Sequence, residues 1–161
     1  MADRYDFDGY EVVTSALREL LNEYPAIDEK IAFSKLADDG GVAMFPTTGS
    51  VIQSERESIT GHVTQVCLYP FYIVYRVAGL SENNKANVKE WLDSLGKWLE
   101  KQPIQVRGEE YKLAEYPTLT GNRKFLDIAR TSPSYLESVN ENKSENWVVR
   151  INASYQNEFD R

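Results

Sequence analysis

The residue types that carry most enzyme chemistry are scarce in this sequence. His62 is the only histidine and Cys67 the only cysteine among 161 residues, and they stand five positions apart in one stretch of strongly β-favouring residues. Odd spacing on a strand places two side chains on opposite faces, here with a rise of roughly 16 Å between them. A Cys–His nucleophile pair needs hydrogen-bond contact, so this strand cannot supply one. We interpret Cys67 as a small apolar residue of the β core.

Other catalytic and ligand-binding patterns are not found either. Zinc sites usually draw on several His or Cys ligands, and this chain has two such residues in all. Residues 38–41 (Asp-Asp-Gly-Gly) lack the alternating oxygen ligands of a calcium loop and predict a plain turn. No glycine-rich phosphate loop and no Gly-x-Ser-x-Gly motif occurs. Glu55 and Glu57 form a carboxylate pair in principle, but their polar surroundings indicate solvated surface. We therefore expect no catalytic centre, no metal and no cofactor.

Composition and charge narrow the classes of partner. The length fits one domain, and the formal net charge is -7. Lys and Arg are scattered among acidic residues, so sequence-specific nucleic-acid binding is not expected, although an acidic wall that DNA slides past is compatible. The longest apolar stretch, residues 66–77, is interrupted by Pro70 and Arg76 and is too short to span a bilayer. One cysteine is compatible with a reducing compartment.

Two segments repeat apolar residues at helical spacing. The first runs from about Asp8 to Tyr24 and ends at Pro25, and the second runs from about Ser81 to Gln102. In the second, the apolar positions are Val88, Trp91, Leu92, Leu95, Trp98 and Leu99. The opposite face of this helix is charged. Both segments therefore predict amphipathic helices with one face on a core.

The strand signals are concentrated in two long segments. Residues 62–77 are rich in Val, Ile, Tyr and Phe and are apolar at both parities, so we expect both faces to be covered, with Pro70 at a bulge or an edge. Residues 146–159 alternate cleanly and predict one buried and one wet face. Shorter strands are predicted at 31–36 and 42–45, as a hairpin around the turn at 38–41, and at 125–130. Residues 104–106 and 111–113 are of uncertain type, and a connection is expected from 132 to 145.

The order of elements predicts one α+β domain over residues 1–161, an antiparallel β-sheet packed against two amphipathic helices. Residues 46–60 interrupt this pattern, because they begin with a Pro-Thr-Thr-Gly-Ser break and continue as a polar segment with little periodicity. A projecting loop or loose hairpin is predicted there. The aromatic residues of 69–75 could stack on bases or sugars, but only one basic residue adjoins them. We favour core packing for them, with a subunit interface as the alternative.

Four stretches carry a resemblance to a known class of protein. They are Ala43–Gly49, Ile59–Phe71, Leu80–Lys85 with the following Glu90-Trp91-Leu92, and the ending Tyr155–Phe159. They resemble minor structural proteins encoded in tail-module regions of tailed phages and prophages of Gram-positive bacteria, known as minor capsid or tail-completion proteins. The order of helices and strands is also similar to that of tail-terminator subunits. These motifs are patterns of core and turn residues, so they indicate a family and no mechanism.

The resemblance implies a function in assembly. In tail terminators, six copies form a ring that caps the tail tube and meets the head connector, with DNA passing through the lumen. A virion location follows, after synthesis in the cytoplasm of the bacterial host, with self, tube and connector proteins as partners and no membrane. Neighbouring copies would meet through the 46–60 segment and the terminal arms. The candidate interface residues are Thr48, Ser50, Ile52, Glu55, Arg56, Glu57 and Phe159.

Two alternatives remain open at this stage. The first keeps the chain in the same virion but places it at the head, as a head-completion or connector-stopper protein. The second is a small-molecule-binding domain or enzyme, whose pocket would lie between the sheet and the helices. A regulatory adaptor is a further, weaker alternative.

Overall fold

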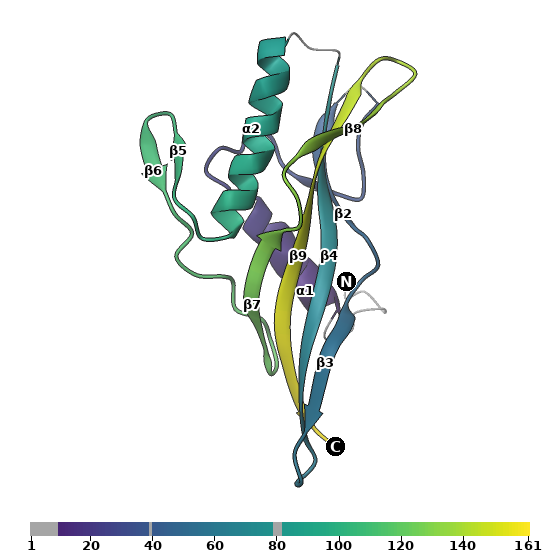
Figure 1. Cartoon of the computed structure of the whole chain (residues 1–161), viewed down its shortest axis with the longest axis vertical. Helices are drawn as coiled ribbons and strands as arrows, with labels where there is room; N and C mark the ends of the chain where they lie inside the picture. Colours follow the sequence, from purple (N-terminus) through teal and green to yellow (C-terminus); the bar gives the residue numbers. More distant parts are fainter. Residues whose placement is uncertain (1–9, 39, 79–81) are drawn as a thin grey trace, which may run out of the picture.

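The structure is a computed structural model that describes residues 10–38, 40–78 and 82–161. It has two helices and a seven-stranded sheet, together with a separate two-stranded sheet (Figure 1). In chain order the elements are α1 (Tyr10–Leu21), β1 (Ala32–Phe33), β2 (Gly41–Pro46), β3 (Val51–Glu57), β4 (His62–Val77), α2 (Glu82–Leu99), β5 (Ile104–Val106), β6 (Glu109–Tyr111), β7 (Arg123–Arg130), β8 (Tyr135–Val139) and β9 (Glu145–Asp160). The predicted helix starts at Asp8 and Ser81 lie outside the described residues.

The sheet is built on one long antiparallel pair. β4 and β9 have 16 residues each and pair from His62↔Asp160 to Val77↔Glu145 without a register shift. β2 and β3 follow each other along the outer side of β4, and β7 and β8 share the outer side of β9. The two central strands therefore set the length and direction of the whole molecule (Figure 1).

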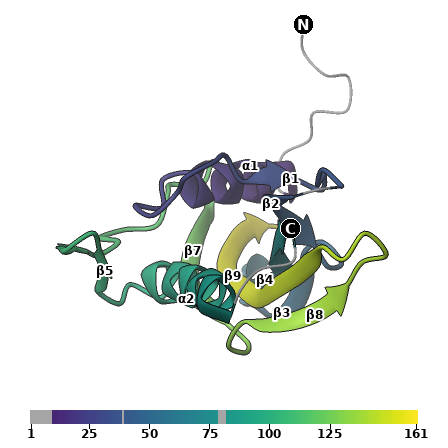
Figure 2. The ribbon, with the colours of Figure 1, turned by 90° about the horizontal axis from the view of Figure 1, so that it is seen from above.

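Both helices pack on one face of the sheet. Leu17 of α1 and Leu92 of α2 join one buried cluster with Tyr69, Phe71 and Ile73 of β4. Figure 2 shows the two helices from above, set apart from each other beside the strands of the sheet. The prediction of a mixed fold with a sheet and two amphipathic helices is thus confirmed, while the sheet has more strands than predicted.

An aromatic cluster connects the two helices. The Tyr24 ring lies just after α1 and meets Trp91 edge-on at 5.2 Å and Trp98 at 5.7 Å, measured between ring centroids. Its hydroxyl donates to the Trp91 carbonyl at 3.0 Å, and the Trp91 indole donates to the Ala26 carbonyl at 2.8 Å. Because each polar tip has a partner, the aromatic side chains can be buried without leaving unsatisfied groups.

The second face of β4 is covered less than predicted. Val74 is buried there, in a row with Ala43 and Val148 of the adjacent strands. Further along the same face, Leu68 and Tyr72 are only half-buried. The expectation that helices or other elements would cover both faces is therefore wrong for most of this strand. Because β4 has apolar residues on both of its faces, a partly exposed apolar surface lies on the side opposite the helices.

The predicted hairpin over residues 31–45 is also wrong. β1 has only two residues and runs parallel to β2, with Ala32 level with Ala43. The intervening loop is held at the end of the sheet by side chains from elsewhere, because Arg76 donates to the Ala37 carbonyl at 3.2 Å and Asn142 to the Asp38 carbonyl at 3.0 Å. The connection between the two parallel strands is thus bonded to distant parts of the chain.

Three further segments differ from expectation or refine it. Residues 51–57 form the strand β3, which makes a hairpin with β4. The expected connection from 132 to 145 contains the strand β8, and residues 104–111 form the separate β5–β6 hairpin. Pro70 sits at a local edge of β4, since β2 ends opposite Phe71 and β3 begins opposite Leu68. The missing N–H of the proline therefore falls where no ladder bond is needed.

A charged cluster fastens α2 to β7. Arg130 crosses the surface of Gly96 and reaches Glu100, with Nε 2.8 Å from Oε2, and its own backbone N–H donates to the same carboxylate at 2.9 Å. The two side chains are only 19% and 17% exposed. Although burial alone would raise the pKa of Glu100, its bonds to Arg130 lower that pKa below the ordinary value. The ion pair is therefore part of the packing between helix and sheet.

Gly96 is the position that tests this packing. A Cβ there would collide with Cγ, Cδ and Nε of Arg130. Alanine normally favours a helix over glycine by about 1 kcal/mol, yet we expect Gly96→Ala to lower the free energy of unfolding by about 1–2 kcal/mol, because Arg130 loses its charged hydrogen bonds. In an Arg130→Ala background the same change should become neutral or stabilising. Urea unfolding of the four variants measures this, and equal effects in both backgrounds would contradict it.

Candidate functional site

His62 and Cys67 lie on opposite faces of β4, as their odd spacing predicts. Cys67 is 5% exposed and faces the helices, level with Tyr155 of β9, and burial raises the pKa of its thiol. His62 lies at the far end of the strand, where its Nδ1 is 2.8 Å from Oδ1 of Asp160. The thiol is thus held protonated inside the core, and the imidazole is engaged by a carboxylate of the neighbouring strand.

Within the described part of the chain, the ionisable groups also form no candidate metal site. No group of three or more His, Cys, Asp or Glu side chains there could hold a metal ion, and no helix there is long and apolar enough to cross a membrane. Glu145 illustrates the structural use of charge, since Lys85 of α2 lies 3.0 Å from its carboxylate and lowers its pKa. This pair fastens the start of β9 to α2.

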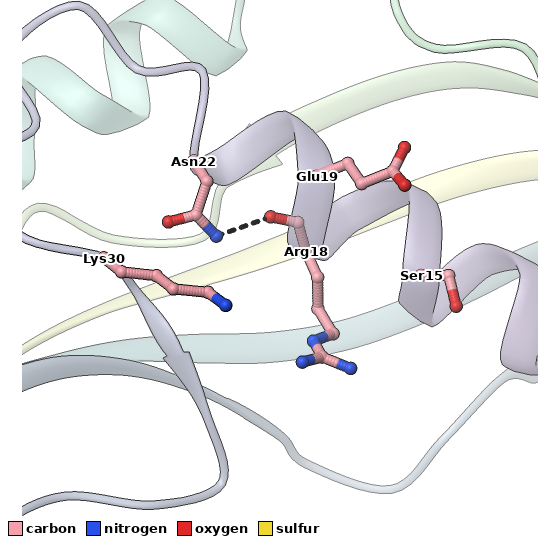
Figure 3. Close-up of a pocket in the computed structure, with 5 residues that line it drawn as sticks. All are labelled: Ser15, Arg18, Glu19, Asn22 and Lys30. Carbon is pink, nitrogen blue, oxygen red and sulfur yellow. Dashed lines mark hydrogen bonds between the residues drawn. The ribbon is translucent and has the colours of Figure 1, made fainter.

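A surface pocket of about 390 Å³ lies beside α1 (Figure 3). Its lining residues are Ser15, Arg18, Glu19, Asn22 and Lys30. The Asn22 side chain has local partners, because its amide N–H donates to the Arg18 carbonyl at 2.8 Å and its amide oxygen accepts from the Ile31 N–H at 2.8 Å. The Arg18 guanidinium lies over the Phe33 ring, 5.2 Å from its centroid. These side chains cap the helix and position the following loop, so the pocket is explained by local structure.

The predicted interface residues gather on a projecting arm formed by β3 and the adjoining ends of β4 and β9 (Figure 1). Four of them, Ile52, Glu55, Arg56 and Glu57, lie on β3, where every residue is exposed. Phe159 lies across the arm in the row of Glu57 and is half-buried. The arm thus brings five of the seven predicted residues onto one structure.

The other two predicted residues lie at the base of the arm. Ser50 accepts a hydrogen bond from the Tyr155 hydroxyl at 2.7 Å, which ties the start of β3 to β9. Thr48 lies in the connection between β2 and β3, where its hydroxyl donates to the Gly49 carbonyl at 3.0 Å. Both side chains therefore have a partner within the chain, although both residues are exposed.

A polar row crosses the arm from one edge to the other. Glu55 of β3, Gln65 of β4, Asn157 of β9 and Arg123 of β7 stand level in successive strands. The Gln65 amide donates to Glu55 at 2.7 Å, and the Asn157 amide donates to Gln65 at 3.2 Å. Directly opposed residues point to the same face of a sheet. The row therefore begins with a carboxylate at one sheet edge and ends with a guanidinium at the other.

Two residues of the arm were not predicted as interface candidates. Arg161 follows β9 and binds Glu55 at 3.3 Å and Glu57 at 3.6 Å. Ile59, in the turn between β3 and β4, is fully exposed at the tip of the arm. The turn is well tied, because the Ser58 N–H donates to the His62 carbonyl at 2.8 Å. The sequence signal for Ile59 was an apolar residue standing alone in a polar turn.

The pKa of His62 should show how strongly its contact with Asp160 holds the tip of the arm. Its pKa is raised above the ordinary value, chiefly by the hydrogen bond to Asp160, with further attraction from Asp160 and Glu158. A raised pKa means that the contact contributes most below the unfolded-state value of about 6.5 and is lost as pH rises through the higher folded-state value. An NMR titration of the His62 ring should therefore give a pKa above 6.5, and Asp160→Asn should lower it.

Asp127→Asn is the matched control for that titration, because it removes an exposed carboxylate from β7. It should leave the His62 midpoint nearly unchanged. A wild-type midpoint at or below the ordinary value, or equal midpoints in wild type and Asp160→Asn, would show that the carboxylate does not hold the ring in solution.

Comparisons with known proteins add no relative for this arm. No protein-family model matches the chain, and no curated protein matches it significantly. What the chain does must therefore be inferred from its own residues and their arrangement. The feature with the most unusual exposure is the arm, which joins an edge strand, a charged row and an apolar tip.

Proposed function

We propose that this chain is a structural subunit of a tailed-phage virion that assembles with copies of itself into a ring. The ring would cap the tail tube and join it to the head, and the fold would be of the tail-terminator type. The observation that carries the proposal is the arm, whose edge strand β3 is exposed along its whole length. An exposed strand edge is a template for pairing with another chain.

The exposed apolar residues of the arm support a contact surface. Val51 and Ile52 on β3 are 49% and 56% exposed, and Ile59 at the tip is fully exposed. Large apolar side chains scattered singly on a surface need no explanation, but these three stand on one projecting structure. Burying these side chains against a partner would offset the unfavourable free energy of exposing them to water.

The phage assignment comes from the sequence resemblance and the overall charge. The net charge of -7 suits a ring whose lumen passes DNA without retaining it, since like charges are repelled. The same features suit a head-completion or connector-stopper protein. Binding to purified tail tubes favours the tail position, whereas binding to the portal side of the head favours the alternative.

Self-association can be tested at Ile52. Ile52→Thr keeps a β-branched residue on the strand but removes apolar area, so we expect little change in the free energy of unfolding and about 5- to 30-fold weaker association. Val139→Thr is the matched control, because Val139 is 58% exposed on β8 at the other end of the sheet. Light scattering over a concentration series measures association, and negative-stain imaging shows whether the particles are rings.

A strictly monomeric wild-type chain would count against the proposal. The concentration series should extend to about 1 mM, because even a weak contact with a dissociation constant of that size is populated at this concentration. Tail tubes should be added in a second series, because a ring can require a template. Failure to associate in both series, or equal loss of association in the Ile52 and Val139 variants, would remove the support that the arm provides.

A further inference from the structure

We propose that the edge of β3 in one copy pairs with the edge of β7 in the next copy, with Glu55 opposite Arg123 of the neighbour. This contact rests on the self-assembly proposed above and specifies its geometry. Among the described strands, β3 pairs only with β4 and β7 only with β9. β3 therefore leaves a row of outward backbone N–H and C=O groups without a ladder partner. On β7 the N–H groups of Ile128 and Arg130 already donate to Tyr116 and Glu100, so the Arg123–Phe125 end of β7 is the part left for pairing.

Strand direction favours this combination of edges. β3 is antiparallel to β4, β4 to β9, and β9 to β7, so β3 and β7 run in opposite directions within one copy. Rotation about an axis along the strands preserves these directions. The β7 edge of the next copy would therefore meet β3 in antiparallel orientation and continue the alternation of the sheet. A β3–β3 pair would instead close as a two-fold dimer and leave both β7 edges open.

The polar row fixes the level at which the two edges meet. Glu55 and Arg123 end the same row, with Gln65 and Asn157 between them. A rotation without translation along the axis keeps residues of one row level with their copies. Glu55 would then stand directly opposite Arg123 of the neighbour, and opposite charges at such a cross-strand position stabilise the pairing. The row would continue from copy to copy around the ring.

Both ends of the row have hydrogen-bonding capacity for this contact. Arg123 donates through Nη1 to the Thr120 carbonyl at 3.1 Å, which uses one of the five N–H groups of a guanidinium. Glu55 receives Gln65 on Oε1 and lies 3.3 Å from Arg161 through Oε2. A carboxylate offers about four lone-pair sites, so a second guanidinium can be accommodated.

Two β-bulges limit how far the edges can pair. β3 shifts register between Ile52 and Ser54, and β7 shifts between Phe125 and Asp127. The two shifts flank one row of the sheet, because Ile52 and Phe125 are both level with the Cys67–Tyr155 pair. Pairing is therefore confined to the arm side of the bulges, which leaves four residues of β3 (54–57) and three of β7 (123–125). Such a short contact is weak alone and depends on ring closure for stability.

Disulfide trapping tests the contact directly. In the Glu55→Cys/Arg123→Cys double variant, the two thiols of one chain are separated by three strand spacings, about 14 Å, which exceeds the reach of a disulfide. Crosslinks can then form only between copies. Mild oxidation should give a ladder of covalent oligomers on a denaturing gel, at least about 10-fold more than in Glu55→Cys/Lys124→Cys, because side chains adjacent on a strand point to opposite faces. The native Cys67 is buried, so the wild-type chain gives the background level of crosslinking.

The outcomes separate this inference from the proposed function. Wild-type association without crosslinks above the Lys124 control would overturn the β3–β7 contact and leave self-assembly standing. Crosslinking of the Glu55→Cys single variant into dimers, as efficient as in the double variant, would overturn it in favour of β3–β3 pairing. Absence of both association and crosslinks would overturn both proposals.

Charge reversal provides an independent readout that requires no oxidation. Glu55→Arg and Arg123→Glu should each weaken association about 5- to 10-fold, since an attractive cross-strand pair becomes repulsive. An equimolar mixture of the two variants should recover association, because each reversed edge then meets an opposite charge on the other variant. Glu137→Arg, a change on an exposed residue of β8, is the control for net charge. Loss of association that the mixture does not recover would contradict the contact.

Discussion

The uninterrupted pairing of β4 with β9 is the constraint on which the rest of this structure depends. Sixteen residue pairs in one register give a ribbon of about 50 Å, whereas the 18 residues of α2 span only about 27 Å. The other helix, α1, is shorter still, with 12 residues or about 18 Å, so neither helix can cover the whole ribbon. An arm of strands without a helical layer is therefore a consequence of the strand length, and along the arm β4 pairs with β3 on one side and with β9 on the other.

The two halves of the ribbon are stabilised in different ways. The helical half has a buried cluster, the Tyr24 aromatic contacts and the Arg130–Glu100 pair, which together fix both helices on the sheet. The arm has no comparable core and relies on ladder bonds, on polar side chains bonded across strands such as Gln65 with Glu55, and on Arg161. Because the arm continues strands that are anchored in the core, it can be held in place without burying its own surface.

Whether a helix or strand could be predicted from the sequence depended on whether one of its faces is buried. α1, α2, β4 and β9 have an apolar face, so their period was visible in the sequence. β3 is exposed on both faces and β8 is exposed throughout, so neither shows the alternation that marks a half-buried strand. The parallel placement of β1 depends on the distant side chains of Arg76 and Asn142, which local patterns do not encode. For the same reason the polar segment of the proposed interface could be recognised in the sequence, whereas the alignment of Glu55 with Arg123 in one row requires the strand register.

An exposed edge strand is a hazard for any protein, and the features that limit the hazard here also make the edge selective. Charges at Glu55, Arg56 and Glu57 and a bulge at the base of the strand discourage unlimited pairing with arbitrary strands. Of these charges, Glu55 is level with a charge of opposite sign on the β7 edge, at Arg123. An edge protected in this way would exclude most partners, and the proposed contact with β7 would supply the single directional pairing that a closed ring requires.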